Sequence, residues 1–364
     1  MKALGVISKF IVSITFIISS LTKAIDPVGV TIKVKEYFQA YGGLDFGDYT
    51  VYLAIALCVL EFLCGAALLI SVKVSFFSLV ALLLTAFFTI LTFFSALYNL
   101  VPDCGCFGDV IKLSAWGTFY KNVILIFFCL VLFVNRKSFR SDNYRHPLGV
   151  IFVVIALILA LCLYSLKTLP PLDFTDFKRG TDLLEASEGN AIKYKTELIY
   201  EKDGVSEIFE LDNLPDSTWT FVETISTVIS GDEKDAAKTK FIVKDSEGNE
   251  VTADLLSKPK VVFLSFYDGK FFKTKSKNFD KLLQFIETQL KEGKALYILS
   301  AFTPEQTSQY FAPLSASISD WKEGGNSCDI FYSDYKTLIT FNRSNGGITF
   351  VNDAKVESKR SALL

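Results

Sequence analysis

The chain has 364 residues with a formal net charge of −2, and 51% of its residues are hydrophobic. Nucleic-acid binding is not expected, because it requires a basic patch that neutralises phosphates. A single histidine argues against a His-dependent hydrolase or a His-rich metal site. The mean hydropathy of +0.37 is high for a soluble protein. Long apolar runs precede Lys167 and most charged residues follow it, which predicts a membrane protein with a soluble tail.

Five segments are long and apolar enough to cross about 30 Å of hydrocarbon, which takes about 20 residues in a helix. They cover residues 4–21, 51–71, 74–98, 119–135 and 148–166. The first follows Lys2 and has an alternative interpretation as a signal peptide, although Lys23 and Asp26 fit poorly around a cleavage site.

Basic residues between the fourth and fifth spans predict the orientation. Arg136, Lys137, Arg140 and Arg145 should hold this short loop in the cytoplasm. The N-terminus would then be cytoplasmic. Loops 23–49 and 99–118 and the whole tail after Lys167 would lie outside.

The tail begins with a rigid exit at Pro170 and Pro171. Alternating apolar residues on both sides of Lys202-Asp203-Gly204 predict a β-hairpin over residues 191–211. From Lys240 onward strands and helices alternate, which predicts an α/β domain around a central sheet. The predicted strands are 241–244, 261–266, 295–299, 330–332, 348–351 and 355–357, and helices are predicted at 279–290, from 303, and at 334–341.

This tail resembles a thioredoxin fold of the TlpA type over residues 240–359. The resemblance rests on Phe241-Ile242-Val243-Lys244-Asp245, on Gly248-Asn249-Glu250-Val251-Thr252 and on the 261–266 strand. Asn345-Gly346-Gly347-Ile348 stands where that fold has its cis-proline. Tyr267-Asp268-Gly269-Lys270 replaces the Cys-x-x-Cys motif. The resemblance therefore implies a thioredoxin-like fold without its dithiol.

The membrane half resembles the MauE family, within the DoxX-like group of four-helix membrane proteins. The matching residues are Lys23-Ala24-Ile25-Asp26-Pro27, Glu61, Gly65 and, most specifically, Cys104-Gly105-Cys106-Phe107-Gly108. The whole arrangement resembles fusion proteins of Gram-negative bacteria. It implies an inner-membrane protein with a periplasmic tail, in contact with the lipid bilayer and with a periplasmic protein partner.

These resemblances predict an all-α membrane bundle of about five helices followed by an α/β thioredoxin-like domain. The expected divisions are a MauE/DoxX-like four-helix domain (1–135), a basic loop with the fifth span (136–167), a linker with the hairpin (168–239) and the thioredoxin-like domain (240–364).

Cys104 and Cys106 are the main candidates for catalysis, since their loop is expected to face an oxidising compartment. Gly105 allows the bend that a disulfide across one residue needs, and strain would make that bond easy to reduce. A redox-active pair, a structural disulfide or tight turn, and a metal site all remain open, although further metal ligands are not evident. The remaining cysteines are interpreted as packing residues: Cys58, Cys64, Cys129, Cys162 and Cys328.

Glu61 lies near the middle of its span, where an ionised carboxylate is costly unless it is paired or hydrated. We expect it to face the bundle interior, either protonated or beside a cation such as Lys23. It contributes either a helix-packing hydrogen bond or proton and quinone handling. Gly65 is expected to permit close helix approach.

Two functional hypotheses follow. The MauE resemblance, and a similarity to the vitamin K epoxide reductase type of enzyme, imply a membrane thiol–disulfide oxidoreductase. Cys104 and Cys106 would exchange with a partner and pass electrons to or from a membrane quinone; no other cofactor is evident. The MauE family is associated with methylamine utilisation and with maturation of a disulfide-rich dehydrogenase. The alternative is a non-enzymatic membrane scaffold in which this cysteine pair only shapes a loop.

Overall fold

The computed structural model describes most of the chain. The described residues are 2–43, 46–98, 100–101, 105, 108, 110, 113–139, 147–188, 193–202, 205–210, 219–230, 239–273, 277–292, 295–312 and 328–361. Cys104 and Cys106 lie outside these residues, as does the side chain of Cys328.

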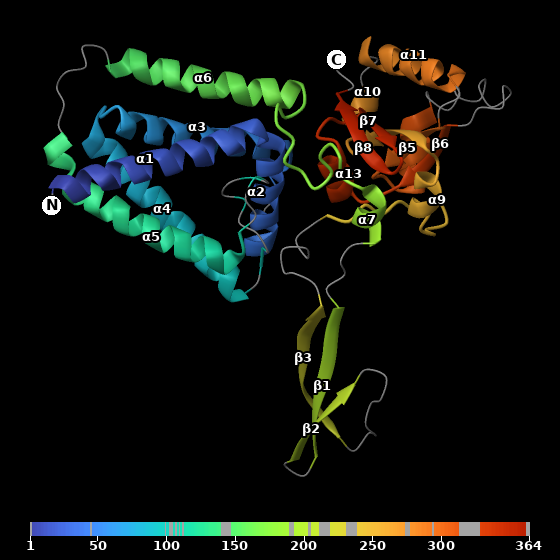
Figure 1. Cartoon of the computed structure of the whole chain (residues 1–364), viewed down its shortest axis with the longest axis horizontal. Coiled ribbons are helices and arrows are strands. Elements are labelled where there is room, and N and C mark those ends of the chain that lie inside the picture. The colour runs from blue at the N-terminus through green and yellow to red at the C-terminus, as the bar shows by residue number, and fades with distance from the viewer. Residues whose placement is uncertain are drawn as a thin grey trace.

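The five predicted membrane spans are confirmed as five long apolar helices. Their buried positions include many small or polar residues beside apolar ones such as Phe16, Leu68 and Leu132, and many other large apolar side chains are exposed, as expected in lipid. α1 packs against α3 and α5, α4 packs against α5, and α6 lies along α3 (Figure 1). The helices are α1 (Lys2–Ile25), α3 (Thr50–Leu69), α4 (Val74–Tyr98), α5 (Ala115–Val134) and α6 (Pro147–Lys167).

A further helix, α2 (Pro27–Gly42), occupies most of the segment that we expected to be a loop. The Asp26 side chain caps its start by accepting a hydrogen bond from the Gly29 amide at 2.9 Å, and Pro27 stands in its first turn. Gly43, with φ of +68°, ends it in the left-handed conformation. α2 crosses the end of the bundle that faces the C-terminal domain (Figure 1).

The predicted hairpin is confirmed and belongs to a larger sheet. β1 (Lys193–Lys202) pairs with β2 (Val205–Glu210) so that Lys202 faces Val205. β3 (Thr220–Ser230), which was not predicted, pairs antiparallel with the other edge of β1. This three-stranded sheet stands apart from both the bundle and the second sheet (Figure 1).

The C-terminal domain contains the predicted central sheet, with five strands in the order β6-β5-β4-β7-β8. β4, β5 and β6 are parallel, while β7 is antiparallel to both β4 and β8. The strands are β4 (Lys260–Phe266), β5 (Ala295–Ser300), β6 (Cys328–Tyr332), β7 (Gly347–Asn352) and β8 (Lys355–Arg360). The helices include α7 (Leu183–Glu188), α9 (Thr252–Leu256), α10 (Lys270–Lys273), α11 (Lys277–Lys291) and α13 (Tyr335–Phe341).

The expectation of a strand at 241–244 is wrong. Only Lys244 pairs there, through isolated bridges to Glu250 and Tyr332. The apolar residues Phe241 and Val243 are nevertheless fully buried. Their alternation therefore reflects burial of one side of an irregular segment and not pairing within the sheet.

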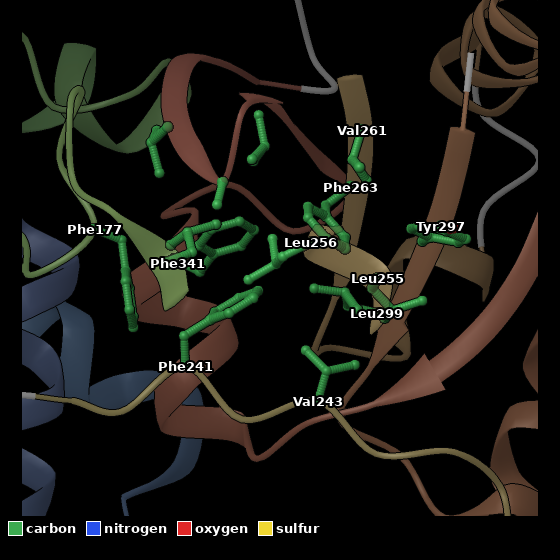
Figure 2. Packing of buried hydrophobic residues seen from close by; sticks show 14 of the residues in the cluster. Phe177, Phe241, Val243, Leu255, Leu256, Val261, Phe263, Tyr297, Leu299 and Phe341 are labelled. Carbon is green, nitrogen blue, oxygen red and sulfur yellow. The ribbon is translucent and has the colours of Figure 1, made fainter. Parts of the chain in front are cut away.

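Aromatic residues fill the core on one face of the five-stranded sheet. Figure 2 shows Phe177, Phe241 and Phe341 together there, and the rings of Phe241 and Phe341 are 4.7 Å apart. Phe177 precedes the three-stranded sheet in the sequence. The Phe241 amide donates to the Ala186 carbonyl at 3.2 Å, so the two ends of the insertion that carries the three-stranded sheet meet at the same place in the domain.

Candidate functional site

A buried ion pair joins α1 and α3. Lys23 Nζ lies 2.6 Å from both carboxylate oxygens of Glu61, and the two side chains are 6% and 5% exposed. Ser19 Oγ donates to Glu61 Oε2 at 3.1 Å and accepts from Lys23 at 3.1 Å. Of the two predicted environments for Glu61, the structure therefore contains the one with a neighbouring cation.

Gly65 lies one turn beyond Glu61 on α3 and faces the backbone of α1. A Cβ atom at this position would lie 2.9 Å from the Ser13 carbonyl oxygen and 3.0 Å from the Ile17 amide nitrogen. Real Cβ atoms do not approach backbone atoms so closely. The predicted packing role of Gly65 is confirmed, and the close crossing brings Lys23 within reach of Glu61.

Gly105, the central residue of the Cys104-Gly105-Cys106 motif, lies against α2. Its φ is +62°, a conformation that glycine adopts without strain. A Cβ atom on Gly105 would lie 2.7 Å from Lys33 Cγ. The middle of the motif therefore packs on the stem of a lysine side chain.

A cavity of about 350 Å³ opens beside this contact, between α2, α3 and α4. Its walls are almost entirely aliphatic and aromatic, with two lysines among the lining residues. A volume of this size is within the range of small-molecule sites. The lining includes Lys23, Lys33, Tyr37, Leu57, Phe88 and Gly105.

Charged contacts connect α2 to the C-terminal domain. Lys33 Nζ is 2.9 Å from one carboxylate oxygen of Glu36, and Lys336 Nζ of α13 is 2.7 Å from the other. Burial alone would raise the pKa of the Glu36 carboxyl. The two lysines outweigh that effect and hold its pKa below the ordinary value.

A second contact between the two halves is more deeply buried. Arg343 donates from Nε and Nη2 to Asp26 Oδ2 at 2.9 and 2.8 Å, and the side chains are 5% and 12% exposed. Asp26 thus caps α2 through one oxygen and binds the C-terminal domain through the other.

The segment after β4 lies near this contact. Asn345 Oδ1 accepts from the amides of Tyr267 and Asp268 at 2.8 and 3.2 Å, and its amide group donates to the Asp268 carbonyl at 2.7 Å. Burial raises the pKa of the Tyr267 hydroxyl. The end of β4 is therefore an ordered, half-buried turn that carries a tyrosine and no thiol.

Four cysteines within the described residues are reduced and buried: Cys58, Cys64, Cys129 and Cys162. Each lies in a membrane helix among apolar side chains, as the packing interpretation predicts. Two of them, Cys58 and Cys162, also contact each other, which the sequence did not indicate. The described residues contain no group of three or more His, Cys, Asp or Glu side chains that could hold a metal ion.

The helices and the separate sheets define a multi-pass membrane protein with a large non-membrane region. Residues 1–135, from α1 through α5, match the family model of the methylamine utilisation protein MauE. Residues 194–231, which include nearly all of β1, β2 and β3, match a domain of unknown function, DUF8463. Searches of curated proteins and of solved structures found no match to the chain. The resemblance of the membrane half to MauE is thus confirmed, and α6 and the C-terminal domain lie beyond the matched residues.

Proposed function

We propose that this protein carries out thiol–disulfide exchange at the outer surface of the bacterial inner membrane, through Cys104 and Cys106. A partner protein with two thiols would be oxidised to its disulfide while the Cys104–Cys106 disulfide is reduced to two thiols. The observation that carries the proposal is the packing of Gly105 on Lys33 at the apolar cavity. The contact is made by the Lys33 stem, while the Lys33 ammonium lies 2.9 Å from Glu36. A positive charge near a cysteine favours the thiolate, which is the reactive form.

The cavity supports a membrane quinone as the electron partner. Its aliphatic and aromatic walls suit the ring of a lipid-soluble quinone, and Gly105 is among its lining residues. Two electrons and two protons from the reduced cysteine pair would convert one quinone to one quinol. The disulfide would thereby be restored for the next partner.

The arrangement of the helix ends supports the proposed orientation. α1 ends at Ile25, and the next residue, Asp26, binds Arg343 of the C-terminal domain. Arg136 and Lys137 follow α5 at the opposite end of the bundle. A cytoplasmic basic loop would therefore place α2, Gly105 and the C-terminal domain together on the periplasmic side.

The C-terminal domain fits a thioredoxin-like fold whose chemistry is lost. Three parallel strands beside an antiparallel pair, with α11 connecting β4 to β5, agree with that fold. Tyr267 and Asp268 occupy the place of the dithiol, and Asn345 holds the backbone there. We infer that this domain positions a partner and does not oxidise it.

A scaffold without redox chemistry is the second candidate. It is favoured by the thiol-free end of β4 and by a three-stranded sheet that stands apart from the rest of the chain (Figure 1). In this case the partner would bind equally well without Cys104 and Cys106.

Trapping in native cells distinguishes the two candidates. A Cys106→Ala variant leaves Cys104 unable to resolve a mixed disulfide, so a partner should remain covalently attached on non-reducing gels. The matched control, with both cysteines replaced by alanine, should lose this adduct. Absence of any adduct, with unchanged non-covalent capture of the partner by the control, would refute the redox function and support the scaffold.

A further inference from the structure

The fifth membrane helix contacts the bundle through a pair of thiols. Cys58 on α3 and Cys162 on α6 have their sulfur atoms 3.8 Å apart, and their exposed fractions are 2% and 0%. Both belong to one small core cluster with Ala24, Ile55 and Ile158. We propose that Cys58 and Cys162 are a second redox-active dithiol, within the bilayer, that a lipid-soluble quinone oxidises to a disulfide.

The surroundings of this pair differ from those of the other membrane thiols. The Cys58 thiol lies 3.2 Å from the Ser20 carbonyl and 3.4 Å from the Ser20 hydroxyl, so its proton has polar acceptors. Cys64 and Cys129 each have one oxygen partner in place of a sulfur contact. These partners are the Phe77 carbonyl at 3.3 Å and the Thr85 hydroxyl at 3.6 Å. Among the four described membrane thiols, Cys58 and Cys162 are the pair in which one sulfur contacts another.

The chemistry balances with a quinone as the oxidant. The two S–H bonds break, one S–S bond forms, and the two electrons and two protons reduce one quinone to one quinol. Water-soluble oxidants do not enter hydrocarbon, whereas quinones dissolve in it. The proposal goes beyond the function proposed above, because it uses neither Cys104 nor Cys106.

The disulfide would change how the two halves of the chain are joined. α6 lies outside the part of the chain that matches the MauE family and leads directly into the C-terminal region. Among its described side chains, those of Ile158, Cys162 and Ser165 are the buried ones, so α6 has only a small buried face against the bundle. A bond from Cys162 to Cys58 would fix α6 to α3 in oxidising membranes and release it in reducing ones.

The test uses the full chain with five cysteines replaced by serine, so that only Cys58 and Cys162 remain, and with a protease site inserted in segment 140–146. The protein is reconstituted in liposomes, treated with decylubiquinone, cleaved, and analysed on non-reducing gels. We expect the two fragments to stay joined until a reductant is added, with one quinone consumed for each disulfide. The matched control retains Cys64 and Cys162 in place of Cys58 and Cys162. Its fragments should separate, because Cys64 lies six residues, about 9 Å, along α3 from Cys58.

Separate fragments after quinone treatment, or equal joining in the control, would overturn the proposal. The unaltered chain provides a second measurement that does not depend on the folding of a variant. After quinone treatment and alkylation of free thiols, mass spectrometry should find the Cys58 and Cys162 peptides linked. Alkylation of both peptides without linkage would equally overturn the proposal.

Discussion

Replacing Glu61 with glutamine tests the buried ion pair most directly. The change keeps the size of the side chain but removes the charge that Lys23 meets at 2.6 Å. With an effective dielectric constant of about 20, two unit charges at that distance attract each other by roughly 6 kcal/mol. The cost of desolvating both ions offsets most of this attraction, so the intact pair contributes little net stability. A lone Lys23 charge would keep the cost without the attraction.

We therefore expect Glu61→Gln to destabilise the folded bundle by about 3–5 kcal/mol, the usual cost of removing one partner of a buried pair. This corresponds to a fall in Tm of roughly 6–20 °C. The assay is thermal unfolding of the purified protein in detergent, followed by loss of helical circular dichroism. The matched control is the double replacement Lys23→Met and Glu61→Met, which removes both charges with little change in volume and should unfold close to the wild type.

The reasoning is refuted if Glu61→Gln unfolds at the wild-type temperature. Such a result would mean that water reaches Lys23, or that the glutamine amide replaces the carboxylate fully. A double variant as unstable as Glu61→Gln would also refute it, because the loss would then come from packing and not from an unpaired charge.

Three further predictions concern packing, pH and topology. Gly65→Ala should destabilise the bundle by about 1–3 kcal/mol in the same unfolding assay, because a Cβ at this position meets backbone atoms of α1. The control Gly149→Ala should be neutral or slightly stabilising, because a Cβ there meets nothing within 4 Å. The folded-state pKa of Glu36 lies below its ordinary value of 4.5, so its stabilising contribution is present above that pH and is lost as the pH falls through the folded value. Proteolytic release of the C-terminal domain should therefore increase in acid, and Glu36→Gln should reduce this pH dependence; an unchanged profile in that variant would contradict the assignment. Alkaline phosphatase fused after Lys167 should be active and a fusion at Arg140 inactive; the reverse pattern would overturn the proposed orientation.

The membrane half could be predicted well because lipid imposes strict rules. Long apolar segments have few alternatives to a spanning helix, and a carboxylate such as Glu61 must find a partner in the bundle. The helix α2 was missed because its mixed polar and apolar residues lack the length and apolarity of a span, although Asp26-Pro27 and Gly43 are good end signals. β3 is rich in Thr, Val and Ile, so its composition could have revealed it.

Contacts between distant segments could not be predicted from the sequence. Asp26 and Arg343 are 317 positions apart, and neither lies in a pattern that indicates the other. The contact between Cys58 and Cys162 depends in the same way on where α6 lies, which hydrophobicity alone does not determine. The pairing of Lys23 with Glu61 is the exception. It could be predicted because burial in lipid restricts the choice of partners for a charged side chain.

α2 has a central position because it contacts both Gly105 and the C-terminal domain. Its Lys33 contacts Gly105 and also binds Glu36, and Glu36 binds Lys336 of the C-terminal domain. Movement of that domain away from α2 would leave Glu36 with Lys33 as its remaining cation in this cluster, and would strengthen their attraction. Under the proposed redox function, the charge near Gly105 would therefore depend on whether the C-terminal domain is docked. A domain without a dithiol could in this way still control the reactivity of the cysteine pair in the membrane half.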